Sequence, residues 1–272
     1  MESDLPHRLG SPGPDPSWPR RRWWQAVAAL ILREVEGTFG RSPGGYLWTI
    51  LEPAAGIAIM SIVFNFVPRM PPLGANFPLF FASGILPFLF YTTVGTKLAS
   101  AIQYSRPLLS YPALTFTDAL LARLALNSMT QILVFAIVIG TILMVWDLRL
   151  TVDWIAIGTA FGMLLSLTFS VGTLNCFLSA RFPVWVQIWA VLNRPMFLVS
   201  GVLFLPEHVP VPYRDVFLLN PLVHVISQFR KGLYAYYDAP FCNPVYVFVV
   251  SIGLGAMGLL LLIRNSQKIL LL

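Results

Sequence analysis

The chain has 272 residues, of which 57% are hydrophobic and only 11% are charged. Soluble globular domains contain about 25% charged residues, so this composition excludes an ordinary soluble domain and indicates a membrane protein. The net charge is +6, and its placement between apolar runs is more informative than its total. No nucleic-acid partner is expected.

The N-terminal region divides into a tail and an amphipathic segment. Residues 1–19 are polar and rich in proline, glycine and serine, which predicts a disordered cytoplasmic tail without a secretory signal peptide. Residues 22–39 place apolar side chains three or four positions apart on one helical face. Arg33 lies among the charged residues opposite, and Glu34 lies at the border. This pattern predicts an amphipathic helix lying in the inner membrane interface.

Six apolar runs are long enough to cross a hydrocarbon core of about 30 Å, which needs about 20 residues. They are residues 46–67, 77–98, 124–146, 154–178, 184–204 and 245–263. Backbone polar groups must be satisfied within lipid, so these runs are expected to be helices. The sequence therefore predicts an all-α membrane protein whose transmembrane domain covers residues 20–265, followed by a short cytoplasmic end at residues 266–272.

The orientation follows from the placement of lysine and arginine. With the N-terminus inside, ten of these residues fall on inner segments and five on outer segments. Positive residues are enriched on the cytoplasmic side of membrane proteins, so both termini are predicted to be cytoplasmic.

The inner segment 103–118, between the second and third spans, has two interpretations. It contains Ser105 and Arg106, followed after a proline by Leu108 and Leu109. It is either a plain cytoplasmic turn or a short docking helix that presents Arg106 and the two leucines to a cytoplasmic partner.

Arg194 is the most unusual residue of the spans, because it stands near the middle of the run 184–204. An unpaired arginine at that depth costs roughly 2.5–3.5 kcal/mol. Arg194 either forms a structural ion pair with Glu52 of the first span or lines a path for an anionic substrate, beside Asn193; a misplaced span is the third possibility. Glu52 is itself either a carboxylate near the interface or a polar group at the inner mouth of a pathway.

The outer segment 205–243 is apolar in patches but is broken by prolines and polar residues. It is too irregular to span the membrane and predicts a re-entrant or interfacial helical hairpin before the last span. His224 in this segment is expected to form hydrogen bonds within the hairpin rather than to act in catalysis.

Several kinds of chemistry are missing from the sequence. There is no GxxxxGK[ST] phosphate loop, and the three histidines lack metal-ligand spacing, so no catalytic or metal site and no bound cofactor are predicted. An integral-membrane transferase would need polar catalytic clusters at one interface. An ion-coupled carrier would need more intramembrane acids or internal repeats. The chain is therefore expected to pass a substrate without a motor of its own.

The entry to the first span resembles a known family. The stretch REVEGTFGRSPGGYLWTILEPAAGIAIMSIVF (residues 33–64) is similar to type-2 ABC exporter permeases, and Gly45, Trp48, Glu52 and Pro53 most resemble the capsular polysaccharide export permeases of the KpsM type. The stretches SGVLFLPEHVP (200–210) and NPLVHVISQFRKGLY (220–234) resemble the outer hairpin of that group. The proline- and glycine-rich SPGG (42–45) departs from the family pattern.

The resemblance implies a homodimer paired with two copies of a separate ATPase subunit, which would bind ATP and magnesium. The complex would export a lipid-linked anionic polysaccharide across the bacterial inner membrane to periplasmic and outer-membrane export proteins. O-antigen, teichoic acid or lipid export stays open as an alternative within the class, and a glycan- or lipid-modifying enzyme as an alternative outside it.

The resemblance also implies roles for individual residues. The first and fifth spans would line the central path, and the interfacial helix and the inner turn would contact the ATPase. The candidates are Trp48, Glu52, Asn193 and Arg194 for the path, Arg33, Glu34, Ser105, Arg106, Leu108 and Leu109 for ATPase coupling, and Asn220, His224, Phe229 and Arg230 for the periplasmic hairpin.

Overall fold

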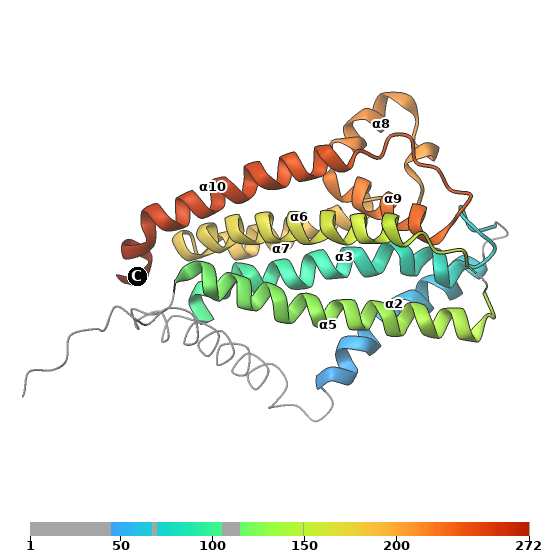
Figure 1. The fold of residues 1–272 in the computed structure, drawn as a ribbon, viewed down its shortest axis with the longest axis horizontal. Coiled ribbons are helices and arrows are strands. Elements are labelled where there is room, and N and C mark those ends of the chain that lie inside the picture. The colour runs from blue at the N-terminus through green and yellow to red at the C-terminus, as the bar shows by residue number, and fades with distance from the viewer. Residues whose placement is uncertain (1–44, 67–69, 105–114, 149, 272) are drawn as a thin grey trace, which may run out of the picture.

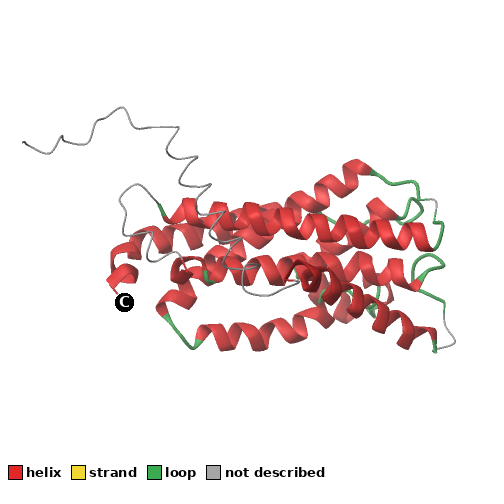
Figure 2. Ribbon diagram, turned by 90° about the horizontal axis from the view of Figure 1, so that it is seen from below, coloured by secondary structure: helices red, strands yellow, loops and turns green. Residues whose placement is uncertain are grey.

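The computed structural model describes residues 45–66, 70–104, 115–148 and 150–271. The elements are α2 (Gly45–Asn65), α3 (Phe77–Ala99), α5 (Phe116–Val145), α6 (Trp154–Arg181), α7 (Trp185–Val199), the 3-10 helix η1 (Pro206–His208), α8 (Val211–Leu218), α9 (Pro221–Leu233) and α10 (Pro244–Leu271). Figure 2 shows helices joined by loops throughout the described ranges. The all-α prediction is confirmed for these residues.

Four long helices, α10, α6, α3 and α5, run along the long axis of the molecule in that order from the top of Figure 1. α3 is the central helix, because it packs on α2, α5, α6 and α9 and 78% of its most apolar window is buried. Its core side chains include Phe80, Phe81 and Phe90. α2 lies at the edge of the bundle, with 17% of its window buried.

Small residues bring α6 and α10 into close contact. A Cβ added to Gly258 would lie 2.8 Å from the backbone nitrogen of Leu174, and one added to Gly255 would lie 2.9 Å from the hydroxyl of Ser170. At Gly258 the close atom belongs to the backbone, so this crossing requires glycine, whereas at Gly255 the hydroxyl of Ser170 would have to move. Close approach through small residues is typical of helix packing in membranes.

Five of the described helices are long and apolar enough to cross a membrane: Leu47–Asn65, Phe77–Ala99, Phe116–Val145, Trp154–Arg181 and Pro244–Asn265. They correspond to the predicted spans 46–67, 77–98, 124–146, 154–178 and 245–263. Helix α10 continues past the predicted end of its span, to Leu271.

Helix α5 begins at Phe116 rather than at the predicted residue 124, for two reasons. Thr115 and Asp118 form a capping box, in which each side chain accepts a hydrogen bond from the other's backbone N–H. One turn further on, Arg123 is buried and donates to the carbonyl of Lys97 (2.7 Å) and to the hydroxyl of Ser100 (3.1 Å). These two acceptors, at and just after the C-terminal end of α3, satisfy the buried guanidinium of Arg123.

The prediction of a continuous helix over residues 184–204 is wrong at its C-terminal end. Helix α7 has 15 residues and ends at Val199, which gives a length of about 22 Å at 1.5 Å per residue. Gly201 follows with φ 73°, a left-handed conformation that ends a helix and suits glycine. Six helices of spanning length are therefore not found in the described ranges.

Other expectations concern residues outside the described ranges. They are the tail 1–19, the amphipathic helix 22–39 with Arg33 and Glu34, and the inner-turn residues Ser105, Arg106, Leu108 and Leu109. These expectations stay predictions. The hairpin segment is helical, with η1, α8 and α9, and its insertion into a membrane also stays a prediction.

Candidate functional site

Helix α7 carries Asn193 and Arg194, and none of its 15 residues is buried in the single chain. Arg194 is exposed, and Asn193 is half-buried. The side-chain oxygen Oδ1 of Asn193 is buried and has no hydrogen-bond partner among the described residues. The polar groups that the sequence placed in a span therefore lie on a helix whose sides are open to another molecule.

Helix α2 carries the other two path candidates, Trp48 and Glu52, both of them exposed. Within the described ranges the ion pair found is Lys231 with Asp238, so Glu52 and Arg194 do not form one in the single chain. The structural ion pair considered from the sequence is thus absent from the chain itself. All four path candidates lie on two helices. Helix α2 is the least buried of the five helices of spanning length, and α7 is a short helix with no buried residue.

The two ends of α7 are attached to the bundle by hydrogen bonds. At the first end, the indole Nε1 of Trp185 donates to Oδ1 of Asn175 on α6 over 2.9 Å. At the second end, Nδ2 of Asn220 donates to the carbonyl of Val199 (3.1 Å) and to the hydroxyl of Ser200 (3.3 Å). Oδ1 of Asn220 also accepts from the N–H of Leu222, over 3.1 Å. Asn220 is therefore both the N-cap of α9 and its link to α7.

Helix α9 is embedded in the bundle, where it packs on α3, α6 and α10. Eleven of its thirteen residues are buried. It crosses α6 closely: a Cβ on Gly232 would lie 2.5 Å from Cγ1 of Ile157. The ring of Phe229 is fully buried and packs on Phe161, with ring centroids 4.8 Å apart, and on Phe135, at 5.3 Å. Phe229 thus belongs to the core.

Arg230 of α9 is fully buried and binds the α7 turn, the name used here for residues 200–205. Its hydrogen bonds run from Nη1 to the carbonyls of Gly201 (2.8 Å) and Phe204 (3.3 Å), from Nη2 to the carbonyl of Val202 (2.8 Å), and from Nε to Ser83 Oγ (3.4 Å). The guanidinium also lies 4.4 Å from the centroid of the Phe80 ring, a cation–π contact. Burial lowers the pKa of Arg230 to about 10, so it stays charged at neutral pH.

Gly84 leaves the room that this arrangement needs. A Cβ at Gly84 would lie 2.9 Å from the Val202 carbonyl oxygen and 3.1 Å from Nη2 of Arg230. Sequence reasoning missed Gly84 and Ser83, which stand in the second apolar run with no motif around them. The hydrogen bond between Ser83 and Arg230 joins residues 147 positions apart, so no local pattern marks it.

His224 joins α9 to both neighbouring segments. Its Nδ1 accepts from the backbone N–H of Asn243 over 3.2 Å, so Nε2 carries the proton and donates to the carbonyl of Leu218 over 2.8 Å. Burial lowers the pKa of this imidazole from its ordinary value. The expectation of hydrogen bonds within the hairpin agrees with this geometry.

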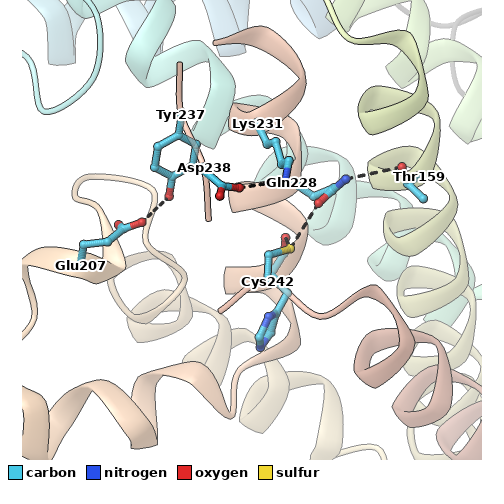
Figure 3. Close-up of polar contacts among 8 residues, drawn as sticks. Thr159, Glu207, Gln228, Lys231, Tyr237, Asp238 and Cys242 are labelled. Atoms are coloured by element: carbon cyan, nitrogen blue, oxygen red, sulfur yellow. Dashed lines mark hydrogen bonds and ion pairs between the residues drawn. The ribbon is translucent and has the colours of Figure 1, made fainter. Parts of the chain in front are cut away.

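Polar contacts fix the rest of the hairpin (Figure 3). Gln228 extends from α9 to Thr159 on α6 (3.5 Å) and lies 3.3 Å from the thiol of Cys242. The hydroxyl of Tyr237 donates to Glu207 over 2.9 Å, and Lys231 pairs with Asp238 at the surface. In the described part of the chain, no three His, Cys, Asp or Glu residues are grouped so as to hold a metal ion.

A cavity of about 600 Å³ lies at the hairpin end of the bundle, between α2, α3 and the α7 turn. We name it the aromatic hollow, because Phe64, Phe77, Phe81 and Phe204 contribute to its lining, with His208 at one side. Aromatic rings offer apolar faces on which the faces of sugar rings can stack.

Comparison with known proteins agrees with the resemblance noted from the motifs. The sequence model of the ABC-2 type transporter family matches residues 25–234. The polysialic acid transport protein KpsM of Escherichia coli is 25% identical over 244 residues, which cover 90% of this chain and 95% of KpsM. Two capsule polysaccharide export inner-membrane proteins, CtrC of Neisseria meningitidis (20% identical) and BexB of Haemophilus influenzae (22% identical), each match 90% of this chain and 92% of their own length.

Proposed function

The chain belongs to the ABC-2 type transporter family, and from that premise we propose that it is the permease subunit of an ATP-driven exporter of capsular polysaccharide. The observation that carries the proposal is the alignment with inner-membrane capsule export proteins over nine-tenths of the chain, with no large part of either protein left over. The polymer would cross the bacterial inner membrane attached to a lipid, with both termini of the chain on the cytoplasmic side.

The proposed active form is a homodimer. Helix α7 has no buried residue and α2 has few, although both helices are mainly apolar. They carry the four path candidates Trp48, Glu52, Asn193 and Arg194. Two copies that meet along these helices would cover apolar surface and enclose the four side chains in a shared path. Arg194 would then face the polymer or the headgroup of its lipid, because a cation in a dry path favours an anionic substrate.

The energy source is proposed to be a separate ATPase subunit that binds ATP and magnesium. This chain would couple to it through Arg33 and Glu34 and through the inner turn with Ser105, Arg106, Leu108 and Leu109. Closure of the ATPase dimer would move helices as rigid bodies and open the path alternately to either side. At the hairpin end, the aromatic hollow would offer sugar rings a stacking surface, and periplasmic and outer-membrane export proteins would receive the polymer there.

The proposal is tested by reconstitution. The chain, purified with its ATPase subunit, is placed in vesicles with a lipid-linked capsular polymer, and ATP-dependent appearance of polymer on the far side is measured. Transport of this polymer is expected, and the control is the same complex with an ATPase that cannot hydrolyse ATP. ATP-dependent transport of an O-antigen or of a plain lipid, with none of the capsular polymer, would overturn the substrate assignment.

A further inference from the structure

Helix α7 packs on the core through a half-buried face with Trp189, Met196 and Phe197, and hydrogen bonds attach its two ends. It contacts its neighbours little compared with the other helices, and its main helix partner is α6. A T-shaped contact joins Phe197 to Phe88 of α3 near one end, with ring centroids 5.2 Å apart. Between the two ends, Trp189 and Asn193 are half-buried, and the other residues, Arg194 among them, are exposed. The position of Asn193 and Arg194 therefore depends on the end attachments as well as on this half-buried face.

The attachment at the hairpin end comes from α9, the most firmly buried of the short helices. Asn220 binds the last carbonyl of α7, at Val199, and Arg230 binds three carbonyls of the α7 turn that follows. Both residues are anchored on α9, which packs against the core helices α3 and α6. The core thus holds the hairpin end of α7 through two polar side chains, in addition to the half-buried contacts of Met196 and Phe197.

The carbonyls at a helix end have no partner within the helix, which makes them natural acceptors for such a connection. Gly201, with its positive φ, is the second residue of the α7 turn, whose carbonyls bind the guanidinium of Arg230. At the opposite end, Trp185 and Asn175 form the second attachment. This end is also joined to α6 by the short connection 182–184, in which the N–H of Trp185 donates to the carbonyl of Phe182 over 2.9 Å.

We propose that Asn220 and Arg230 are positioning residues for transport: they fix the hairpin end of α7 and thereby the place of Asn193 and Arg194 in the path. The inference rests on the proposed function, because it gives α7 a role in export. It assigns to the hairpin a task inside the membrane subunit, in addition to contact with other export proteins.

The test uses Asn220→Ser in the full permease–ATPase complex. Serine is as good an N-cap as asparagine, so the start of α9 is kept, while the shorter side chain cannot donate to Val199. Hydrogen exchange followed by mass spectrometry reports on α7 and α9 separately. The rate of amide hydrogen exchange in the second half of α7 is expected to rise about threefold to tenfold, because the loss of one hydrogen bond makes local opening easier by that factor. The rate in α9 should stay unchanged. Export is expected to fall by a similar factor.

Two further variants sharpen the result. Asn243→Ser is the matched control: Asn243 caps the start of α10 through Oδ1, which accepts from the N–H of Tyr246 over 3.1 Å, and its backbone N–H donates to His224 of α9. It is expected to leave exchange in α7 and export at the level of the unmodified protein. Trp185→Phe keeps an aromatic ring and removes the indole donor, and is expected to raise exchange in the first half of α7.

The outcomes separate the inference from the proposed function. Unchanged exchange in α7 of Asn220→Ser overturns the inference, whatever the export rate. Faster exchange with unchanged export overturns the positioning role, because α7 would then be loosened without any effect on transport. Faster exchange together with reduced export supports the inference. Failure of the unmodified complex to transport any capsular polymer would instead overturn the proposed function and leave the exchange result standing.

Discussion

Helices α9 and α7 are similar in length and stand close together in the fold, yet their environments are opposite. Eleven of the thirteen residues of α9 are buried, whereas none of the fifteen residues of α7 is. α9 contains the fully buried Arg230, bonded to three backbone carbonyls, and α7 contains the exposed Arg194 without an ion pair. The comparison teaches that an arginine in an apolar region has a structural task when its donors are satisfied, and is available to a ligand when they are not.

The largest effect is expected for Arg230→Met. The substitution leaves the buried carbonyls of the α7 turn without their hydrogen-bond donor. The free energy of unfolding is expected to fall by about 3 kcal/mol. The thermal unfolding temperature of the purified protein and its amount in the membrane are expected to fall. A variant that unfolds at the original temperature would show that the turn finds other donors and that the buried charge is not what stabilises α9.

Gly84→Ala tests the same contact from the α3 side. The added methyl group meets the Val202 carbonyl oxygen at 2.9 Å, and overpacking of this kind costs typically about 1–3 kcal/mol. A fall in the unfolding temperature smaller than that of Arg230→Met is expected. Gly140→Ala on α5 is the matched control, since a Cβ there meets no atom within 4 Å and alanine favours a helix.

Arg194→Ala is expected to behave in the opposite way. Because the side chain is exposed, the free energy of unfolding should change by less than about 0.5 kcal/mol. Export is expected to fall about tenfold, which corresponds to about 1.4 kcal/mol, while dimer and ATPase assembly stay intact. Arg194→Lys, which keeps the charge, should retain more export than alanine. Normal export by the alanine variant would remove Arg194 from the path.

His224 gives the smallest effect, and one that depends on pH. Burial lowers the pKa of the folded state below the ordinary 6.5, so the unfolded chain binds the proton first as the pH falls. The stabilisation is complete above pH 6.5 and is lost as the pH falls through the folded pKa. Unfolding measured between pH 8 and 5 should show this loss. In His224→Gln the dependence should be weaker, and an identical pH profile would exclude His224 as its source.

The sequence by itself determined the all-helical class, because each apolar run of about 20 residues must satisfy its own backbone within lipid. Five of the six predicted runs match helices of spanning length, and the family follows from motifs such as Gly45-x-x-Trp48-x-x-x-Glu52-Pro53. The segment 205–243 contains the short helices η1, α8 and α9 and no helix of spanning length, and its insertion as a re-entrant or interfacial hairpin stays a prediction.

The tertiary structure decided where α7 ends and what the hairpin residues do. Hydropathy continues through Phe204, but the helix stops at Val199, because Gly201 turns the backbone and Arg230 binds the carbonyls that follow. Arg230 and Phe229 of the hairpin segment are buried in the core. These contacts join α9 to residues as distant as Ser83, 147 positions away. Local patterns carry no information about such partners, since packing brings them together only once the chain has folded.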